Sequence, residues 1–250
     1  MTNLVEFKLV MKIKYDPSPN FSFGIRPKKN IKFLIIHYTG MQSEIETIKR
    51  LKNAKSKVSC HYLINRKGVI TQMVREDKVS WHAGKSKWKK FINLNEHSIG
   101  IELVNRGHEF GYQKFSTIQI TSLIKLCKRL KKKYSLKREN ILGHSDIAPL
   151  RKSDPGEKFP WKKLNQYRLG NWFSYSKKNI KFANGVKTDN IFFKNLHKLG
   201  YRYFKIKSRN REKDKLIIKS FQQHYLPKNV SGKIDLKTLK ISHLLANCTK

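Results

Sequence analysis

The sequence has few acidic residues, few cysteines and no long apolar run. It contains 17 Asp and Glu residues against 55 Lys and Arg residues, so its formal net charge at pH 7 is +38. Such a charge predicts attraction to polyanions such as nucleic acid, anionic lipid or an acidic cell-wall polymer, although a general lysine-rich bias gives the same count. No stretch approaches the roughly 20 apolar residues that a membrane-spanning helix needs, so we expect no such helix.

The three cysteines, Cys60, Cys127 and Cys248, are odd in number and scattered along the chain. This pattern argues against a disulfide framework and suits a reducing compartment. Residues 1–30 lack the continuous apolar segment and the small-residue cleavage site of an export signal. We therefore expect a cytoplasmic protein, with the cell envelope as the alternative.

Hydrophobic periodicity predicts both strands and helices before residue 172. Short β-branched runs predict strands, and Ser-x-x-Glu and Ser-x-x-Gln patterns predict helix starts at Ser43 and Ser116. Gly68 is expected to sit in the turn of a hairpin, and Gly100 to mark a close backbone approach or a bulge within a strand. The predicted strands are 31–38, 61–65, 69–74, 98–104 and a short strand ending at 141–144; the predicted helices are about 43–53 and a long one from 116.

The chain is predicted to contain two folded parts. The mixture of strands and helices favours a layered α/β domain over residues 31–172, preceded by an N-terminal extension, 1–30. Residues 173–186 are expected to form a linker. Three amphipathic stretches then predict a small three-helix domain over residues 187–250, with helices near 190–199, 214–226 and 235–246.

Three separated residues form a candidate zinc site. His37 and His144 each follow a predicted strand, and Asp154 lies in a loop rich in Asp, Pro and Gly. Two imidazoles and one carboxylate match a catalytic zinc site with one zinc per chain, because three protein ligands leave the fourth tetrahedral position for water. In a chain with nine histidines, such a triple also arises by chance.

Hydrolysis at such a site also needs a proton carrier and a positive group. Bound zinc lowers the pKa of water towards neutrality, which makes hydroxide available at physiological pH. Glu102 is the candidate that accepts the water proton and passes it to the leaving nitrogen. Lys152 is the candidate that stabilises the negative charge of the tetrahedral intermediate, although a solvated lysine is the commoner reading in this chain.

Six sequence blocks occur in order between residues 33 and 156. They are Phe-Leu-Ile-Ile-His-Tyr-Thr (33–39), Ser-Cys-His-Tyr-Leu-Ile (59–64), Trp-His-Ala-Gly (81–84), Ser-Ile-Gly-Ile-Glu-Leu (98–103), Gly-His-Ser-Asp-Ile-Ala-Pro (143–149) and Arg-Lys-Ser-Asp-Pro-Gly (151–156). Together they resemble the type 2 N-acetylmuramoyl-L-alanine amidases, whose fold is shared with phage amidase lysozymes and animal peptidoglycan recognition proteins. The resemblance covers roughly residues 30 to 165.

This resemblance implies a mixed central β-sheet flanked by helices and a zinc-dependent amidase. The enzyme would cut the amide bond between the muramoyl lactyl group and L-alanine in peptidoglycan or soluble muropeptides, during cell-wall turnover and recycling. The family's functional positions carried over by the blocks are His37, His144 and Asp154 for zinc, Glu102 and Lys152 for catalysis, and His61, Trp81, His82, Ala83 and Gly84 near the substrate groove.

The C-terminal residues 187–250 resemble the three-helix peptidoglycan-binding domain that often follows such amidases, on segments such as Leu-Gly-Tyr at 199–201. Helices that pack without a ligand are the alternative. Some relatives with this arrangement are exported lipoproteins, whereas this sequence shows no lipoprotein signal, so turnover of anhydro-muropeptides in the cytoplasm fits it better. The sequence makes no prediction of oligomeric state.

Three other functions remain open at this stage. A cysteine amidase would use Cys60 as its nucleophile and need no metal. A non-enzymatic receptor would bind peptidoglycan without cleaving it. A nucleic-acid-binding protein would rely on charge and lose affinity steeply with salt, but no helix-turn-helix or zinc-finger spacing supports specific nucleic-acid recognition.

Overall fold

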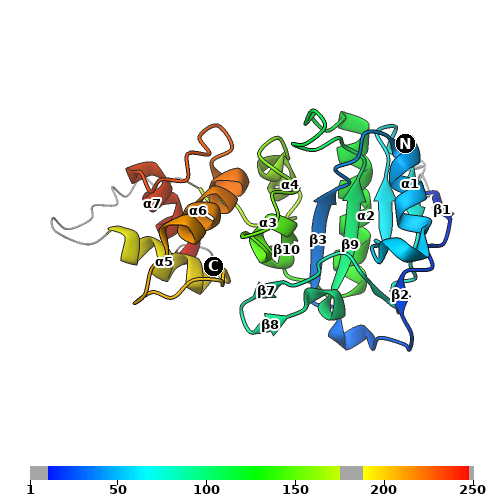
Figure 1. Ribbon diagram of the computed structural model, residues 1–250, viewed down its shortest axis with the longest axis horizontal. Coiled ribbons are helices and arrows are strands. Elements are labelled where there is room, and N and C mark those ends of the chain that lie inside the picture. The colour runs from blue at the N-terminus through cyan, green and yellow to red at the C-terminus, as the bar shows by residue number, and fades with distance from the viewer. Residues whose placement is uncertain (1–10, 175–187, 248–250) are drawn as a thin grey trace, which may run out of the picture.

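A six-stranded mixed sheet forms the centre of the structure, which is a computed structural model describing residues 11–174 and 188–247 (Figure 1). The strand order is β1-β5-β4-β9-β3-β10; β4 and β5 are antiparallel, and the other neighbours are parallel. The sheet strands are β1 (Ile13–Tyr15), β3 (Phe33–Tyr38), β4 (Tyr62–Ile64), β5 (Ile70–Gln72), β9 (Ser98–Leu103) and β10 (Ile141–Gly143). Two small pairs lie outside it: β2 (Phe21–Ser22) with β6 (Val79–Ser80), and β7 (Lys87–Trp88) with β8 (Phe91–Ile92).

The helices begin where their capping residues predict. The Ser43 hydroxyl accepts a hydrogen bond from the Glu46 N–H at 3.1 Å, and the Ser116 hydroxyl accepts one from the Gln119 N–H at 3.2 Å. Each bond satisfies an N–H that has no partner inside the helix. The α-helices are α1 (Glu44–Lys52), α2 (Thr117–Lys133), α3 (His144–Ile147), α4 (Trp161–Gln166), α5 (Thr188–Leu199), α6 (Arg211–Tyr225) and α7 (Leu236–Asn247). None of these helices is long and apolar enough to cross a membrane.

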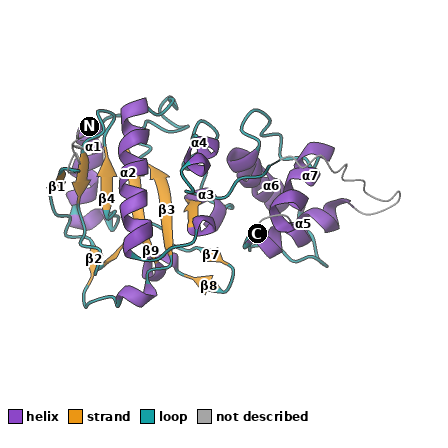
Figure 2. Ribbon diagram, turned by 180° about the vertical axis from the view of Figure 1, so that it is seen from behind, coloured by secondary structure: helices purple, strands orange, loops and turns teal. Residues whose placement is uncertain are grey.

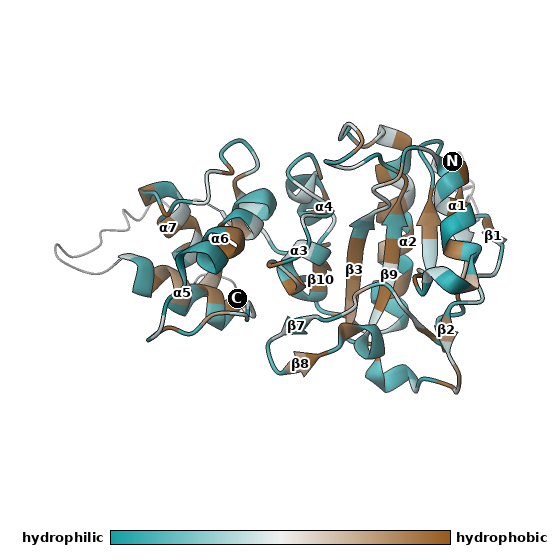
Figure 3. Ribbon diagram, in the orientation of Figure 1, coloured by the Kyte–Doolittle hydropathy of each residue, from teal (hydrophilic) through white to brown (hydrophobic). Residues whose placement is uncertain are grey.

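The alternation of side chains along β3 separates the core from the site. Leu34 and Ile36 point to the face covered by α2, where they join one hydrophobic cluster with Leu123 and Leu130. The helix lies across that face in the view from behind (Figure 2). His37 follows Ile36, so its side chain points to the opposite face. Figure 3 shows the hydrophobic residues concentrated along β3 and β9 in the middle of the sheet.

Part of the expected N-terminal extension belongs to the sheet. Residues 13–15 form β1, which pairs in parallel with β5. Farther along, Arg26 is buried and its guanidinium donates to the carbonyl oxygens of Ser98 at 2.6 Å and Glu76 at 2.8 Å. A boundary at residue 30 would therefore cut through packed structure. β1 was not predicted, because a strand of three residues is too short to show a period of two.

The C-terminal helices pack against the sheet domain. Phe33 and Ile35 of β3 share a hydrophobic cluster with Phe192 of α5 and Phe221 of α6. The predicted helices near 190–199, 214–226 and 235–246 correspond to α5, α6 and α7 within a few residues. Most of the expected linker, from 175 to 186, and Cys248 lie outside the described residues. The division of the chain into two domains stays a prediction.

Candidate functional site

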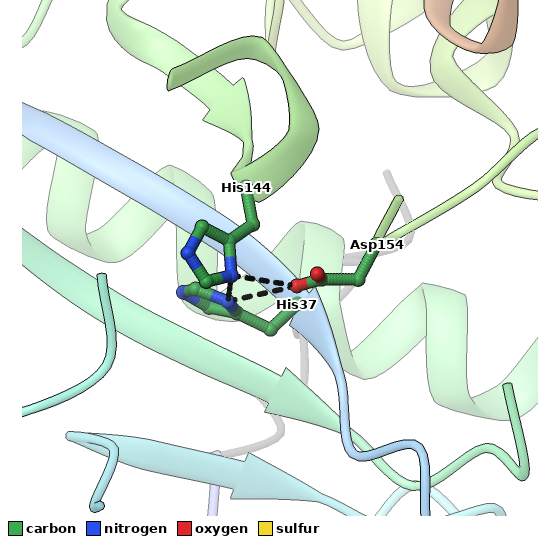
Figure 4. Close-up of side chains that lie close together, drawn as sticks. All are labelled: His37, His144 and Asp154. Carbon is green, nitrogen blue, oxygen red and sulfur yellow. Dashed lines mark hydrogen bonds and ion pairs between the residues drawn. The ribbon is translucent and has the colours of Figure 1, made fainter. Parts of the chain in front are cut away.

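Neighbouring parallel strands bring the candidate site residues to one edge of the sheet. His37 of β3 and Glu102 of β9 are register partners, so their side chains project from the same face. β10 pairs with β3 on the other side, and its last residue, Gly143, is followed directly by His144 at the start of α3. Asp154 reaches the same place from the loop after α3 (Figure 4).

Two imidazoles and one carboxylate converge in the arrangement that the sequence predicts. His37 Nδ1 lies 2.9 Å from His144 Nδ1, and each of these nitrogens lies 3.0 Å from Asp154 Oδ2. All three residues are buried. A tetrahedral zinc ion with ligand bonds of 2.0–2.1 Å separates its ligand atoms by about 3.3 Å, so the triangle is close to the size of one face of that tetrahedron.

A chain of hydrogen bonds fixes the orientation of His37. The Ser98 hydroxyl donates to the carbonyl of Leu94 at 2.5 Å, so it accepts from His82 Nε2 at 3.2 Å. His82 Nδ1 is then the acceptor for His37 Nε2, 3.0 Å away. The proton of His37 therefore sits on Nε2, and the Nδ1 lone pair points towards Asp154 and His144.

His144 is oriented in the same way from a different element. Its Nε2 donates to the carbonyl of Ala83 at 3.1 Å, so its Nδ1 also presents a lone pair to the centre. The lone pairs of two ring nitrogens only 2.9 Å apart repel each other unless a cation lies between them. The donor set therefore fits a divalent metal ion, and both outer ring nitrogens have the partners that metal-binding histidines usually have.

The protonation states of His37 and Asp154 also suit a metal. Burial and the neighbouring His144 lower the pKa of His37 to about 4, so the ring is neutral at pH 7. Burial alone would raise the pKa of Asp154, but the charges of and hydrogen bonds from His144 and His37 outweigh it and hold that pKa well below its usual range. Deprotonated nitrogen and ionised carboxylate are the forms that bind zinc.

Glu102 has one buried carboxyl oxygen without a hydrogen-bond partner among the described residues. Its Oε2 is buried and accepts no hydrogen bond from any described residue. Burial, followed by the charge of Asp154, raises the pKa of Glu102 from 4.5 to about 8, although Lys152 acts in the opposite direction. A carboxyl group with a pKa close to neutrality can both accept and return a proton at physiological pH.

The site opens into a cavity of about 570 Å³, within the usual size of a small-molecule site. The metal-site residues, Glu102 and the exposed Lys152 line it, together with Trp81 and His82. Its lining also contains three charged residues that sequence reasoning missed, Arg50, Glu109 and Arg151. The sequence does not set these two arginines apart from the other basic residues, because the 55 Lys and Arg residues are spread over the whole chain.

Three residues expected near the groove are placed away from the cavity lining. His61 is fully buried, and its Nδ1 accepts from the N–H of Gly100 at 3.0 Å. Ala83 is also fully buried and presents its carbonyl to His144. Gly84 takes a φ of 54° and lies against the side chain of Arg151. The ring of His61 and the carbonyl of Ala83 therefore have hydrogen-bond partners within the protein.

Cys60 does not have the surroundings of a nucleophile. It is fully buried, and burial together with the charge of Glu102 raises the pKa of the thiol well above its usual range. A reactive cysteine needs a lowered pKa and access to substrate. Cys60 therefore behaves as a small apolar core residue beside Leu63 and Met73.

Comparison with known proteins agrees with this geometry. Residues 27–157 match the family model of N-acetylmuramoyl-L-alanine amidase. The N-acetylmuramoyl-L-alanine amidase AmiD of Escherichia coli K12 is 36% identical over 231 residues, which span 86% of this chain and 82% of AmiD. The 1,6-anhydro-N-acetylmuramyl-L-alanine amidase AmpD of Haemophilus influenzae is 32% identical over 177 residues, which span 64% of this chain and 94% of AmpD.

Solved structures show the same fold. The complex of E. coli AmiD with the substrate anhydro-N-acetylmuramic acid-L-Ala-D-γ-Glu-L-Lys has a TM-score of 0.76 and 32% identity, and the match covers 90% of this chain and 91% of that one. AmpDh3 of Pseudomonas aeruginosa has a TM-score of 0.76 and 28% identity, covering 91% and 95% of the two chains. With its sheet and its candidate metal site already in agreement, the chain belongs to the N-acetylmuramoyl-L-alanine amidase family.

Proposed function

We propose that the protein is a zinc-dependent amidase that hydrolyses the bond between the lactyl group of N-acetylmuramic acid and L-alanine in muropeptides. The observation that carries this proposal is the convergence of one ligand atom each from His37, His144 and Asp154, 2.9 to 3.0 Å apart, on a cavity that Glu102 also lines. Membership of the amidase family supports the same reaction.

Each site residue has a role that its position supports. A zinc ion held by His37, His144 and Asp154 would supply a Lewis acid and an acidified water. Glu102 takes a proton from the attacking water and delivers it to the departing amide nitrogen, which its raised pKa makes feasible in both directions. The ammonium group of Lys152 balances the negative charge that develops on the carbonyl oxygen.

The proposed substrates are soluble muropeptides, including those with 1,6-anhydro-muramic acid. AmiD binds such a substrate in its solved complex, and that protein matches nearly the whole chain. Stem peptides carry free carboxylates, and Arg50, Arg151 and Lys152 give the cavity lining the complementary charge. Intact peptidoglycan is the second substrate to test, since a chain with a net charge of +38 is attracted to anionic polymers.

The proposed compartment is the cytoplasm. Among the described residues, Cys60 and Cys127 are both buried and unpaired, which suits a reducing environment. Cell fractionation would test this assignment: recovery of the native protein with the envelope would refute it.

Hydrolysis in ¹⁸O-labelled water tests the reaction. Zinc-loaded protein is mixed with purified anhydro-muropeptide, and the masses of the products are measured by mass spectrometry. Because water attacks the lactyl carbonyl, we expect anhydro-muramic acid with one ¹⁸O in its carboxylate and an unlabelled free peptide. Chelation should stop the reaction, and added zinc should restore it.

The same assay separates the alternatives. Intact substrate in the presence of protein that holds one zinc per chain would refute the amidase, and measurable binding of that substrate would then favour a receptor. Activity that survives complete zinc removal would exclude the metal mechanism.

A further inference from the structure

The C-terminal helices contact the start of α3, which carries the candidate ligand His144. The two residues after His144, Ser145 and Asp146, are buried at 3% and 1% exposure. Their partners are Tyr201, which follows α5, and Ser220 and His224 of α6, all of which lie about 55 to 80 residues farther along the chain. α3 and α6 lie side by side in both ribbon views (Figures 1 and 2).

Asp146 is held from both sides. Its Oδ1 accepts from the Tyr201 hydroxyl at 2.5 Å, and its Oδ2 accepts from His224 Nδ1 at 2.8 Å. Oδ2 also accepts from the N–H of Gly143 at 2.8 Å, which ties the carboxylate to the turn that contains His144. Hydrogen bonds to a buried carboxylate are stronger than those between neutral groups, so these bonds restrain the turn.

Ser145 links α6 to the third candidate ligand. Its carbonyl accepts from the Ser220 hydroxyl at 2.7 Å, and its N–H donates to the carbonyl of Asp154 at 2.8 Å. The backbone next to His144 is therefore bonded on one side to the C-terminal helices and on the other side to the residue that supplies the carboxylate oxygen.

The partners are themselves rigid. The His224 ring stacks on Trp161 with centroids 3.9 Å apart and an angle of 14° between the rings. The Tyr201 ring is fully buried and packs against Trp88 with centroids 4.9 Å apart. Burial also raises the pKa of the Tyr201 hydroxyl well above its usual range, so that hydroxyl remains a donor to Asp146.

We infer that the C-terminal helices are part of the catalytic unit, because Tyr201 and Ser220 act as positioning residues that hold His144 and Asp154 at the separation that a metal ion requires. This inference rests on the proposed metal site. It assigns to residues 188–247 a role besides the glycan binding that the sequence predicts, and it needs no glycan in contact with them.

The test uses the full-length chain with Tyr201→Phe, Ser220→Ala and, as a matched control, Ser242→Ala. Tyr201→Phe removes only the hydroxyl. Ser242 is buried like Ser220 and lies on α7, but its hydroxyl donates to the carbonyl of Leu239 inside the same helix and accepts from Asn195 of α5, so its bonds stay among the C-terminal helices. The two serine variants therefore lose the same group from similar depth.

Three quantities are measured for each variant: the zinc dissociation constant by competition with a chromophoric chelator, the visible spectrum of the Co²⁺-substituted protein, and the thermal midpoint of the zinc-free protein. Removal of partners that support metal ligands costs about 10- to 100-fold in metal affinity. Since Tyr201 and Ser220 act one bond farther out, we expect zinc binding weakened by about 3- to 10-fold in both variants and an altered Co²⁺ spectrum. The Ser242→Ala protein should match the wild type in zinc affinity and spectrum, even where its thermal midpoint falls as much as that of Ser220→Ala.

Unchanged zinc affinity and Co²⁺ spectrum in both Tyr201→Phe and Ser220→Ala would overturn the inference while leaving the proposed function intact. An equal loss in the Ser242→Ala control would also overturn it, because the effect would then be one of general stability. Failure of the wild-type protein to bind one zinc per chain would instead overturn the proposed function and the inference together.

Discussion

Replacing Glu102 by Gln should stabilise the zinc-free protein while removing its activity. The structure buries this carboxyl group next to Asp154 with an unpaired oxygen, and its pKa rises from 4.5 to about 8. A raised carboxyl pKa means that the folded state binds the proton more tightly than the unfolded state. Ionisation of Glu102 therefore costs stability, and this cost appears above pH 4.5 and grows until about pH 8.

The size of the effect follows from the shift. One pKa unit corresponds to about 1.4 kcal/mol, so the full shift sets an upper limit of about 5 kcal/mol. Although Glu102 Oε2 is buried, the residue as a whole keeps some exposure and solvent screens part of this cost, so we expect about 1 to 3 kcal/mol. The neutral amide of Gln avoids the cost at every pH, because it carries no charge.

Urea unfolding of chelator-treated protein at pH 5 and pH 9 measures this difference. We expect the Gln variant to exceed the wild type by about 1 to 3 kcal/mol at pH 9 and by less than about 1 kcal/mol at pH 5. Added zinc should reduce the advantage, since a nearby cation favours the ionised carboxylate of the wild type. Turnover should fall by about 10²- to 10⁴-fold with zinc still bound.

Glu109→Gln is the matched control, because Glu109 lines the same cavity but is exposed. It should change stability by no more than about 0.5 kcal/mol at either pH. A stability difference for Glu102→Gln that does not depend on pH would refute the reasoning, as would a wild type that is the more stable protein at pH 9.

His144→Ala should lose both bound zinc and activity, whereas Glu102→Ala should keep its zinc; equal metal loss by elemental analysis in the two variants would show that Glu102 has another role. Gly100→Ala places a Cβ 2.3 Å from the His82 ring, so we expect a loss of about 1 to 3 kcal/mol in urea unfolding and weaker zinc binding as His82 moves away from His37. Unchanged zinc affinity there would contradict the orienting chain through His82. Alkylation of the native, folded protein should leave Cys60 unmodified and activity intact, because the thiol is fully buried. Rapid inactivation that tracks modification of Cys60 would instead support the cysteine mechanism.

Local sequence patterns predicted the helices and strands, whereas their arrangement in space depends on pairing between residues far apart in the sequence. The helix starts at Ser43 and Ser116 depend on bonds to residues three positions away, so the sequence contains them directly. The pairing of His37 with Glu102 depends instead on the register of two strands separated by more than fifty residues. Six motif blocks supplied that information through resemblance, since periodicity alone does not fix which strands are neighbours.

Two features of the site could not be predicted in this way. The contact of His82 with His37 arises because Gly100 leaves room for the His82 ring against β9; the sequence predicted a close approach at Gly100 but not that His82 would make it. The hydrogen bonds of Asp146 to Tyr201 and His224 join the predicted α/β domain to the predicted C-terminal helices, and the sequence pattern of neither part indicates this contact. Nothing in the sequence around Asp146, two positions after a candidate ligand, indicates which residues it will bind.

The short β1 strand has a practical consequence for any shortened form of the protein. It pairs with the outer edge of β5 and is itself the edge strand of the sheet, and its residues Lys14 and Tyr15 are exposed. Deleting residues 1–30 would uncover the N–H and C=O groups of β5 and leave a template on which a second molecule can add a strand. Truncated protein should therefore aggregate during expression, and a shortened form meant for crystallisation is better started ahead of Ile13.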